Sequence, residues 1–573
     1  MRKWTRWMVL AVASCAAPQQ APTSSVPSAD LKPGAERFLD QGWSTADRET
    51  FTKTAQGSRL IPLAWFRALQ RAGHDGLFAA DQLQRYGYLP TPASSGDATP
   101  LPVGFVRDGT PADPQLGMTC AACHTGQLHY KGQAWRIDGG RANADFQTFL
   151  ADLGLAVRAT LAEPDRFKAF SAAVLGRAAS PAQASQLQRD LAAWSQSYSS
   201  FMAASLPDPP WGPGRLDAFG MIFNRVAGLD LGFPANLHKA DAPVRYPFIW
   251  DAPRQDRTQW TGAAPNGTYL RGMARNTGEV FGVFGRLDPL ALPLHQVLYR
   301  NSVDRAGLQT LEEKVVALRA PPWPREAFGL DEARVGEGKQ IFKTECAGCH
   351  GAVPSRIVEK AWNTVVADVG TDRRTFDNSQ LTGSPRILTG TQQPPLVGER
   401  LADPSRKISI LANAVTGSLA QAALAHDNGV HRAIRQDLLE GRLPLLDAAQ
   451  AASPTAAVAS ATHDLYKAAD QEPGAAYEAR VLTGIWAVGP YLHNGSVANL
   501  WELLKPASQR MTHFAVGHRE FDPVHVGLET APARGRAMFV VDPASGNGNG
   551  GHEYGTALPE RDRWALIEYL KTL

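Results

Sequence analysis

The sequence predicts a mainly α protein with two domains and long ordered loops. First, a short motif, Cys-x-x-Cys-His, occurs twice, at 120–124 and 346–350, and divides the 573 residues into two halves. Second, amphipathic patterns at 330–344 and 559–573 predict helices just before the second motif and at the end of the chain. Third, a content of 52 Gly and 41 Pro favours long loops between modest helices.

Each copy of the motif is typical of covalent attachment of a c-type haem. Two thiols one helical turn apart can form thioethers to the two vinyl groups of one porphyrin, and the following histidine is then held under the iron as its proximal ligand. A zinc knuckle or a redox dithiol is the alternative, but zinc does not require a histidine directly after the second cysteine. The sequence therefore predicts two covalently bound haem c groups in two cytochrome c-like domains. The residues concerned are Cys120, Cys123 and His124 in the first copy and Cys346, Cys349 and His350 in the second.

The N-terminus resembles a bacterial export signal, with a basic start, an apolar run over 7–13 and small residues before Cys15. Residues 12–15 resemble a lipobox, in which Cys15 is lipidated and becomes the first residue of the mature protein; ordinary cleavage just after Cys15 is the alternative. We therefore expect a lipoprotein signal peptide over 1–15 and a flexible tether over 16–35. The protein is then exported, to the periplasmic side or to the outer membrane.

The composition of the chain indicates which kinds of bonds and binding partners to expect. Four of the five cysteines belong to the two motifs, which leaves none for a disulfide framework once Cys15 is lipidated. The net charge is +3 and no basic block is present, so nucleic acid is not expected as a partner. Apart from the signal, no segment has the roughly 20 apolar residues of a membrane span. Contact with a membrane is therefore expected only through the lipid anchor.

The predicted domains are an N-terminal haem c domain over 36–325 and a C-terminal cytochrome c domain over 326–573. In cytochrome c folds the first and last helices cross closely. We expect such a crossing between 330–344 and 559–573, with two unrelated surface helices as the alternative. The residues expected to meet there are Gly338 and Phe342 on the first helix and Leu566 and Tyr569 on the last. Further predictions are helices over 181–204, 308–319 and 408–425, a loop over 92–116 and a poorly ordered stretch over 445–460.

The sixth iron ligand of a small cytochrome lies in the loop before the last helix. Here that loop is glycine-rich and contains His552, which is the predicted ligand opposite His350. Met538 and other histidines remain alternatives. The first half offers His129, His238 and His295. None of them lies in a comparable loop, and each is expected to be a surface or hydrogen-bonded histidine. An open sixth position opposite His124 is therefore predicted, where oxygen or peroxide could react.

A third motif, at 490–496, reads Pro-Tyr-Leu-His-Asn-Gly-Ser. It resembles a segment of the bacterial di-haem cytochrome c peroxidases. In that family the histidine lies near the second haem without having to ligate it. His493 is therefore expected to support the site or to contact a haem propionate. Several other stretches are similar to one branch of the superfamily, the di-haem rubber oxygenases: 136–140, 214–220, 273–279, 484–496 and 516–523.

This resemblance implies that the two haems have different roles. In rubber oxygenases the N-terminal haem binds dioxygen and the C-terminal haem has two histidine ligands, which corresponds to His124 with an open face and to His350 with His552. The family also places an apolar aromatic side chain over the open haem, and Phe248 is the candidate here, with a plain core residue as the alternative. A lipid anchor departs from the family if the substrate is an external polymer.

The function predicted from the sequence is that of a haem-dependent oxidoreductase. It would activate dioxygen or hydrogen peroxide at haem 1 with haem 2 as electron-transfer partner, in the manner of a rubber oxygenase. The partners would be a small electron-donor cytochrome or an apolar organic substrate. The alternatives are a di-haem cytochrome c peroxidase and a non-catalytic electron-transfer cytochrome.

Overall fold

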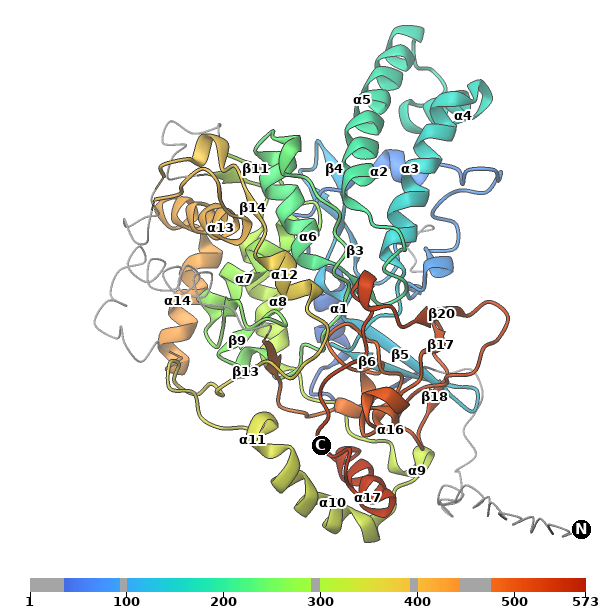
Figure 1. Ribbon diagram of the computed structural model, residues 1–573. Helices are drawn as coiled ribbons and strands as arrows, with labels where there is room; N and C mark the ends of the chain where they lie inside the picture. Colours follow the sequence, from blue (N-terminus) through green and yellow to red (C-terminus); the bar gives the residue numbers. More distant parts are fainter. Residues whose placement is uncertain (1–35, 93–99, 290–298, 392–399, 443–475) are drawn as a thin grey trace, which may run out of the picture.

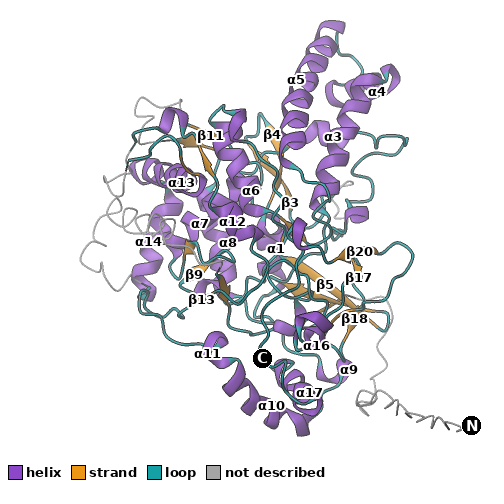
Figure 2. Cartoon of the chain, in the orientation of Figure 1, coloured by secondary structure: helices purple, strands orange, loops and turns teal. Residues whose placement is uncertain are grey.

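The computed structural model describes residues 36–92, 100–289, 299–391, 400–442 and 476–573. With 43% of residues helical and 15% in strands, the protein is mixed α/β, and the prediction of a mainly α fold with two cytochrome c domains was wrong. The strands form nine sheets of two or three strands within the described residues (Figures 1 and 2). Segments expected to be loops pair as short strands because buried backbone groups require hydrogen-bond partners. The predicted loop over 92–116, for example, contains β3 (Phe105–Gly109) and the start of β4 (Pro114–Met118).

The N-terminal half contains two three-stranded sheets. In one, β6 (Gln133–Asp138) pairs in parallel with β1 (Glu36–Phe38) and antiparallel with β5 (Thr125–Tyr130). In the other, β4 pairs antiparallel with both β2 (Ile61–Pro62) and β3. The first Cys-x-x-Cys-His motif follows β4 directly, so the end of a central strand rather than a long helix positions it.

The helices of the N-terminal half pack largely on one another. α3, α4 and α5 project from the body at the top of Figure 1. The helices predicted over 181–204 and 308–319 are confirmed as α5 and α8. The elements are α1 (Thr45–Lys53), α2 (Leu63–Ala68), α3 (Phe146–Ala162), α4 (Pro164–Leu175), α5 (Pro181–Ser205), α6 (Ala218–Phe223), α7 (Tyr269–Gly282), α8 (Arg305–Ala317) and α9 (Arg325–Phe328).

The C-terminal half also contains helices. The helix predicted over 408–425 is confirmed as α13, and the stretch 445–460 lies outside the described residues. The elements are α10 (Glu332–Glu345), α11 (Ala347–His350), α12 (Arg374–Ser379), α13 (Lys407–Leu424), α14 (Asn428–Glu440), α16 (Leu500–Leu503) and α17 (Glu560–Leu570).

α10 and α17 cross closely at the bottom of Figure 1. A Cβ atom added to Gly338 would lie 1.9 Å from the carbonyl oxygen of Ala565, so only glycine permits this approach. The rings of Phe342 and Tyr569 meet beside it with centroids 5.3 Å apart. The predicted crossing of the two helices is confirmed.

The remaining strands form two-stranded ladders, all antiparallel, that fasten loops to one another. They are β7 (Arg215–Leu216) with β8 (Val244–Arg245), β9 (Arg257–Thr258) with β10 (Ala264–Pro265), β11 (Leu287–Asp288) with β12 (Arg300–Asn301), β13 (Val365–Ala367) with β16 (Tyr477–Ala479), β14 (Thr382–Gly383) with β15 (Ser405–Arg406), β17 (His513–Val516) with β20 (Ala537–Val540), and β18 (Phe521–Asp522) with β19 (Gly527–Leu528).

An aromatic cluster surrounds the predicted domain boundary near residue 325. The ring centroids of Trp323 and Trp486 are 5.2 Å apart, and so are those of Phe328 and Phe521. The largest group of buried apolar side chains includes residues from both predicted domains. The division at 325 stays a prediction, while the hydrophobic core continues across it.

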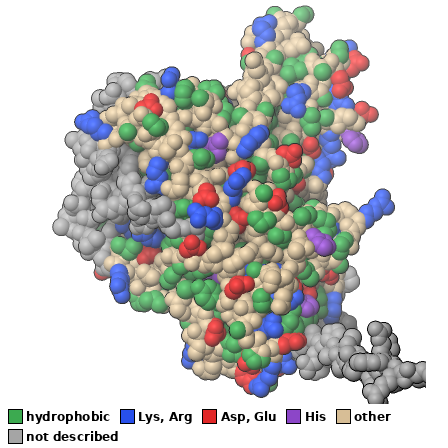
Figure 3. Space-filling model, in the orientation of Figure 1, with side chains coloured by type: hydrophobic (Ala, Val, Ile, Leu, Met, Phe, Trp, Pro, Cys, Tyr) green, Lys and Arg blue, Asp and Glu red, His purple; other side chains and the backbone are tan. Residues whose placement is uncertain are grey.

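The surface carries both signs of charge. On the face drawn in Figure 3, basic and acidic side chains are interspersed. No single helix in the described ranges is long and apolar enough to cross a membrane; α13 and α14 would meet that criterion only as a pair, and the pair bends by 93°.

Candidate functional site

The first motif folds into a tight turn. The turn η2 (Cys120–Ala122) begins after β4, where the Thr119 hydroxyl accepts the N–H of Ala121. Gly104 has a φ of +82°, and a Cβ there would lie 2.0 Å from the backbone nitrogen of Ala122. This close backbone approach requires glycine.

His124 is oriented by the backbone. Its Nδ1 lies 2.8 Å from the carbonyl oxygen of Pro247. Since a carbonyl only accepts, Nδ1 carries the proton and Nε2 keeps its lone pair. Burial lowers the pKa of His124 to about 4, so the ring is neutral, which is the form that binds a metal.

A cavity opens beside this motif, and we call it the N-terminal cavity. Cys120, Cys123 and His124 line it, and His124 is the one histidine among the described residues that do so. Part of the wall is apolar, with the buried side chains of Phe219, Ile222, Leu311 and Val315.

Another part of that wall is ionic. Arg275 of α7 lies 3.0 Å from a carboxylate oxygen of Glu312 and 3.8 Å from one of Glu279. Gln259 donates a hydrogen bond to Glu279. Burial raises the pKa of Glu279, against the opposing effect of Arg275. The wall of the cavity therefore combines apolar side chains with a group of ionisable ones, among them the Glu279 carboxyl group.

The second motif lies at the joint of two helices, since α10 ends at Glu345 and α11 carries His350. The Nδ1 atom of His350 lies 2.7 Å from the carbonyl oxygen of Arg480, which again leaves Nε2 with its lone pair. Burial lowers the pKa of His350. Cys346, Cys349 and His350 line a second cavity, which we call the C-terminal cavity.

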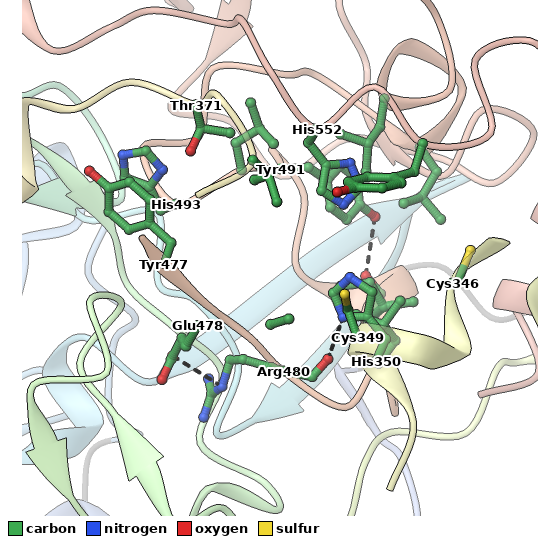
Figure 4. Close-up of a pocket in the computed structure, with 18 of the residues that line it drawn as sticks. Cys346, Cys349, His350, Thr371, Tyr477, Glu478, Arg480, Tyr491, His493 and His552 are labelled. Atoms are coloured by element: carbon green, nitrogen blue, oxygen red, sulfur yellow. Dashed lines mark hydrogen bonds and ion pairs between the residues drawn. The ribbon is translucent and has the colours of Figure 1, made fainter. Parts of the chain in front are cut away.

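His552 lies opposite His350 in the C-terminal cavity (Figure 4). The centroids of the two imidazole rings are 6.1 Å apart. An iron bound by one nitrogen of each ring at about 2 Å would hold the centroids roughly 6 Å apart. His552 has a φ of +49°, and its N–H donates to Val369 at 2.8 Å. Burial, together with nearby His350, lowers the pKa of His552 to about 4, so this ring is neutral as well.

The end of the C-terminal cavity away from the cysteines is polar. Figure 4 shows His493, Tyr477 and Thr371 there. His493 stacks on Tyr477 with ring centroids 3.9 Å apart, and burial lowers its pKa to about 3. Within the described residues, Nε2 of His493 and the Thr371 hydroxyl are buried without a hydrogen-bond partner. Both could donate to a carboxylate, and haem propionates lie opposite the vinyl groups that bind cysteine.

The two cavities share one wall. Arg245, Phe248, Trp260, Glu478 and Arg480 line both. Phe248 is 1% exposed and stacks on Trp250 at 4.8 Å, with the Arg480 guanidinium 4.3 Å from the Phe248 ring centroid. Its predicted position over the open face of a haem stays a prediction.

Hydrogen bonds through this wall join the two motif histidines. His124 donates to the carbonyl of Pro247, and the next carbonyl, that of Phe248, accepts from Nη1 of Arg480 at 2.5 Å. The carbonyl of Arg480 itself accepts from His350. One arginine thus connects the environments of both histidines.

These residues fit a c-type haem at each motif. Each motif supplies two thiols and a neutral imidazole whose Nε2 is free of the orienting hydrogen bond. The C-terminal cavity adds a second imidazole at the required spacing, and buried donors lacking partners lie at its far end.

The other predicted residues lie elsewhere. Met538, on β20, is 39% exposed and is not among the described residues that line the C-terminal cavity. His129 contacts Gln127 and Glu520, and His238 contacts Lys407. Cys15 and His295 lie outside the described residues.

Comparison with known proteins shows the family. The chain is 32% identical to the uncharacterized protein y4iJ of Sinorhizobium fredii over 591 residues, which cover 94% of this chain and 93% of y4iJ. The chain belongs to the y4iJ family. A second protein of that organism, y4iM, is 35% identical over 117 residues, or 17% of this chain and 27% of y4iM.

A family profile described as RoxA-like, cytochrome c-like matches residues 476–515. That segment contains Tyr477, Glu478 and Arg480 of the shared wall and C-terminal cavity, together with His493. The match indicates a rubber-oxygenase-like cytochrome and implies haem c and a haem-based redox function.

Sequence reasoning missed the residues of the shared wall other than Phe248. Glu478 and Arg480 are two positions apart near β16, so their side chains can point to the same face of the strand. This spacing was the one signal in the sequence that could have identified them. Trp260 and Arg245 carry no such pattern, because only the fold brings them between the cavities.

Proposed function

We propose that this y4iJ-family protein is a di-haem c-type oxidoreductase. It activates dioxygen or peroxide in the N-terminal cavity, and the C-terminal haem is its electron-transfer partner. An apolar organic molecule is the proposed co-substrate. The haem, when bound, supplies the binding and reduction of oxygen species at its iron.

The observation that carries this proposal is the asymmetry of the cavities. His350 has His552 across from it at the spacing of two axial ligands. Among the described residues that line the N-terminal cavity, no second histidine faces His124 as a possible ligand. Met221 is the one thioether among them. An iron with two imidazoles transfers electrons and excludes other ligands, while one with an exchangeable position can bind a small molecule.

The side chains and backbone of the protein orient the two proximal imidazoles, shape the N-terminal cavity and offer a path for electrons. The carbonyls of Pro247 and Arg480 fix the tautomer and angle of the two proximal imidazoles. Phe248 and Trp260, which line both cavities, offer aromatic groups between the redox centres. The apolar wall of the N-terminal cavity suits an apolar substrate and excludes water.

Carbon monoxide binding tests the asymmetry. In the reduced protein it should bind about half of the haem, because only one iron has an exchangeable position. Met221→Leu should leave this fraction unchanged. If carbon monoxide binds to neither haem, the protein is an electron carrier and the proposed enzymatic function is wrong. Product analysis with a polyisoprene latex then tests the co-substrate.

A specific observation favours a second candidate function, the reduction of hydrogen peroxide. Glu279 is an ionisable group in the wall of the N-terminal cavity, held by Gln259 and Arg275. Cleavage of a peroxide O–O bond with two electrons and two protons yields water, and a carboxyl group can deliver a proton. Peroxide consumption with a small reduced cytochrome as donor, and no product from an apolar substrate, would establish this alternative.

We also propose that the mature protein is exported and held at a membrane by lipidated Cys15. The support is the lipobox-like sequence and the fact that bacteria attach haem to such motifs outside the cytoplasm. Fractionation of cells that express the full chain tests this.

A further inference from the structure

Two buried arginines lie directly opposite each other in a two-stranded ladder. Arg215 of β7 pairs with Arg245 of β8, and their exposed fractions are 7% and 5%. Like charges that face each other across two strands are destabilising, and buried charges normally have a counter-charge.

A third arginine adds to the same charge. Arg141 is 8% exposed and lines one cavity together with Arg215 and Arg245. We call it the arginine cavity. It lies between the two halves of the chain, since Pro209 and Pro213 line one side and Pro490 and Phe539 the other.

The hydrogen bonds of the three guanidinium groups do not neutralise them. Within the described residues, Arg141 donates to the Asn143 side chain at 2.6 Å and Arg245 to two backbone carbonyls. Arg215 donates to the carbonyls of Trp211 and Asn494 and to the Asn547 side chain. All of these acceptors are uncharged.

The two carboxylates in the cavity wall serve as helix caps. Asp145 accepts the N–H of Thr148 at the start of α3, and Asp542 accepts that of Ala544. Burial, together with nearby Arg141, lowers the pKa of Arg215 to about 9, while Asp145 opposes this shift. The cavity thus retains an excess of positive charge.

We propose that the arginine cavity is a binding site for an oxyanion, either a carboxylate or a phosphate. Three guanidinium groups offer planar N–H donors that match such an anion, and a bound anion would offset their mutual repulsion. Two sources have this chemistry: a haem propionate, which rests on the proposed function, and a free anion such as phosphate, which does not.

The test uses the full-length holoprotein and inorganic phosphate as the probe. Thermal unfolding is followed during a phosphate titration at constant ionic strength, with chloride as the replacing anion. The variants are Arg141→Gln, which keeps a donor for Asn143, and Arg141→Lys, which keeps the charge. Arg189→Gln, on the exposed face of α5, is the matched control.

If a free anion occupies the site, phosphate raises the midpoint of unfolding of the wild-type protein. Arg141→Gln then weakens the apparent phosphate affinity by about tenfold, the loss of one charge-assisted contact. Arg141→Lys and Arg189→Gln retain the response.

If a propionate occupies the site, phosphate has no effect, but Arg141→Gln shifts one haem potential to a more negative value and lowers the midpoint of unfolding. Removal of a nearby positive charge favours the ferric haem. Arg189→Gln changes neither quantity.

The proposal is overturned if phosphate acts no differently from chloride, the haem potentials do not move, and Arg141→Gln unfolds at the same or a higher temperature. That result would show that loss of one of three repelling charges relieves strain. A protein without haem would refute the proposed function, yet the phosphate titration would still test this site.

Discussion

The imidazole rings of His350 and His552 face each other across the C-terminal cavity with their centroids 6.1 Å apart. They come from opposite ends of the C-terminal half, one from α11 and the other from the loop before α17. The crossing of α10 and α17 holds these segments together, since each histidine lies within ten residues of one of the crossed helices. The spacing leaves room for an iron atom between the rings.

Replacement of His552 by alanine should open the C-terminal haem. We expect part of the visible spectrum to become high-spin and the fraction of reduced haem that binds carbon monoxide to rise from about one half towards all of it, because only His350 remains as a protein ligand. Absorption spectra of the ferric and the carbon monoxide forms measure both. Met538→Leu is the control and should change neither; a low-spin His552→Ala protein would mean that another residue is the ligand.

The protein should carry two covalently bound haems per chain when it is made in a periplasm that attaches haem. Pyridine haemochrome absorbance per mole of protein should give two. The double variant Cys120→Ser with Cys123→Ser should give one, since its thioethers cannot form. Bound zinc, or one haem in the unmodified chain, would contradict the proposal.

Arg480→Met should destabilise the fold. Arg480 lies 3.5 Å from Glu478, whose side chain is 2% exposed, so the change leaves a carboxyl group buried without its partner. A loss of about 3–5 kcal/mol in the free energy of unfolding is expected from such a break. Urea unfolding measures it, and the addition of Glu478→Gln should restore part of the loss.

Arg480→Met should also change the spectra of both haems, because its side chain donates to the Phe248 carbonyl, next to the one that orients His124, and its backbone orients His350. An effect on neither spectrum would show that the hydrogen bonds through the shared wall do not govern the irons. Glu478→Gln alone is the matched control.

Glu279→Gln should slow turnover in the N-terminal cavity by about 10²–10⁴-fold if Glu279 delivers a proton. Burial raises the pKa of Glu279, so the carboxyl group keeps its proton to a higher pH than an ordinary glutamate. The wild-type rate should therefore fall as the pH rises through this raised pKa, and the variant should lose that dependence. Rate against pH for both proteins measures this; parallel profiles would exclude the role.

Cys15→Ser should release the protein from membranes or leave its precursor uncut. A lipidated Cys15 would label with fatty acid and pellet with the membrane fraction. An unmodified mature N-terminus beyond residue 15 would contradict the prediction.

The local features were predictable from sequence, because they depend on residues close together in the chain. The two motifs, the α10 and α17 patterns and the helices α5, α8 and α13 follow from short-range spacing and hydrophobic periodicity. The placement of His552 could be anticipated from a glycine-rich loop ahead of a terminal helix. The two-stranded ladders could not be anticipated in this way. Each of their strands is two to four residues long and pairs with a segment that the sequence does not identify.

The sequence by itself determined where haem c is expected to attach, because the two thiols and the imidazole of each motif are neighbours in the chain. Only the tertiary structure decided which side chains lie between the cavities and which arginines meet. Arg480 contacts His350 from 130 residues away, and Arg215 contacts Asn547 from 332 residues away. Such contacts depend on how the whole chain packs, which no local pattern encodes.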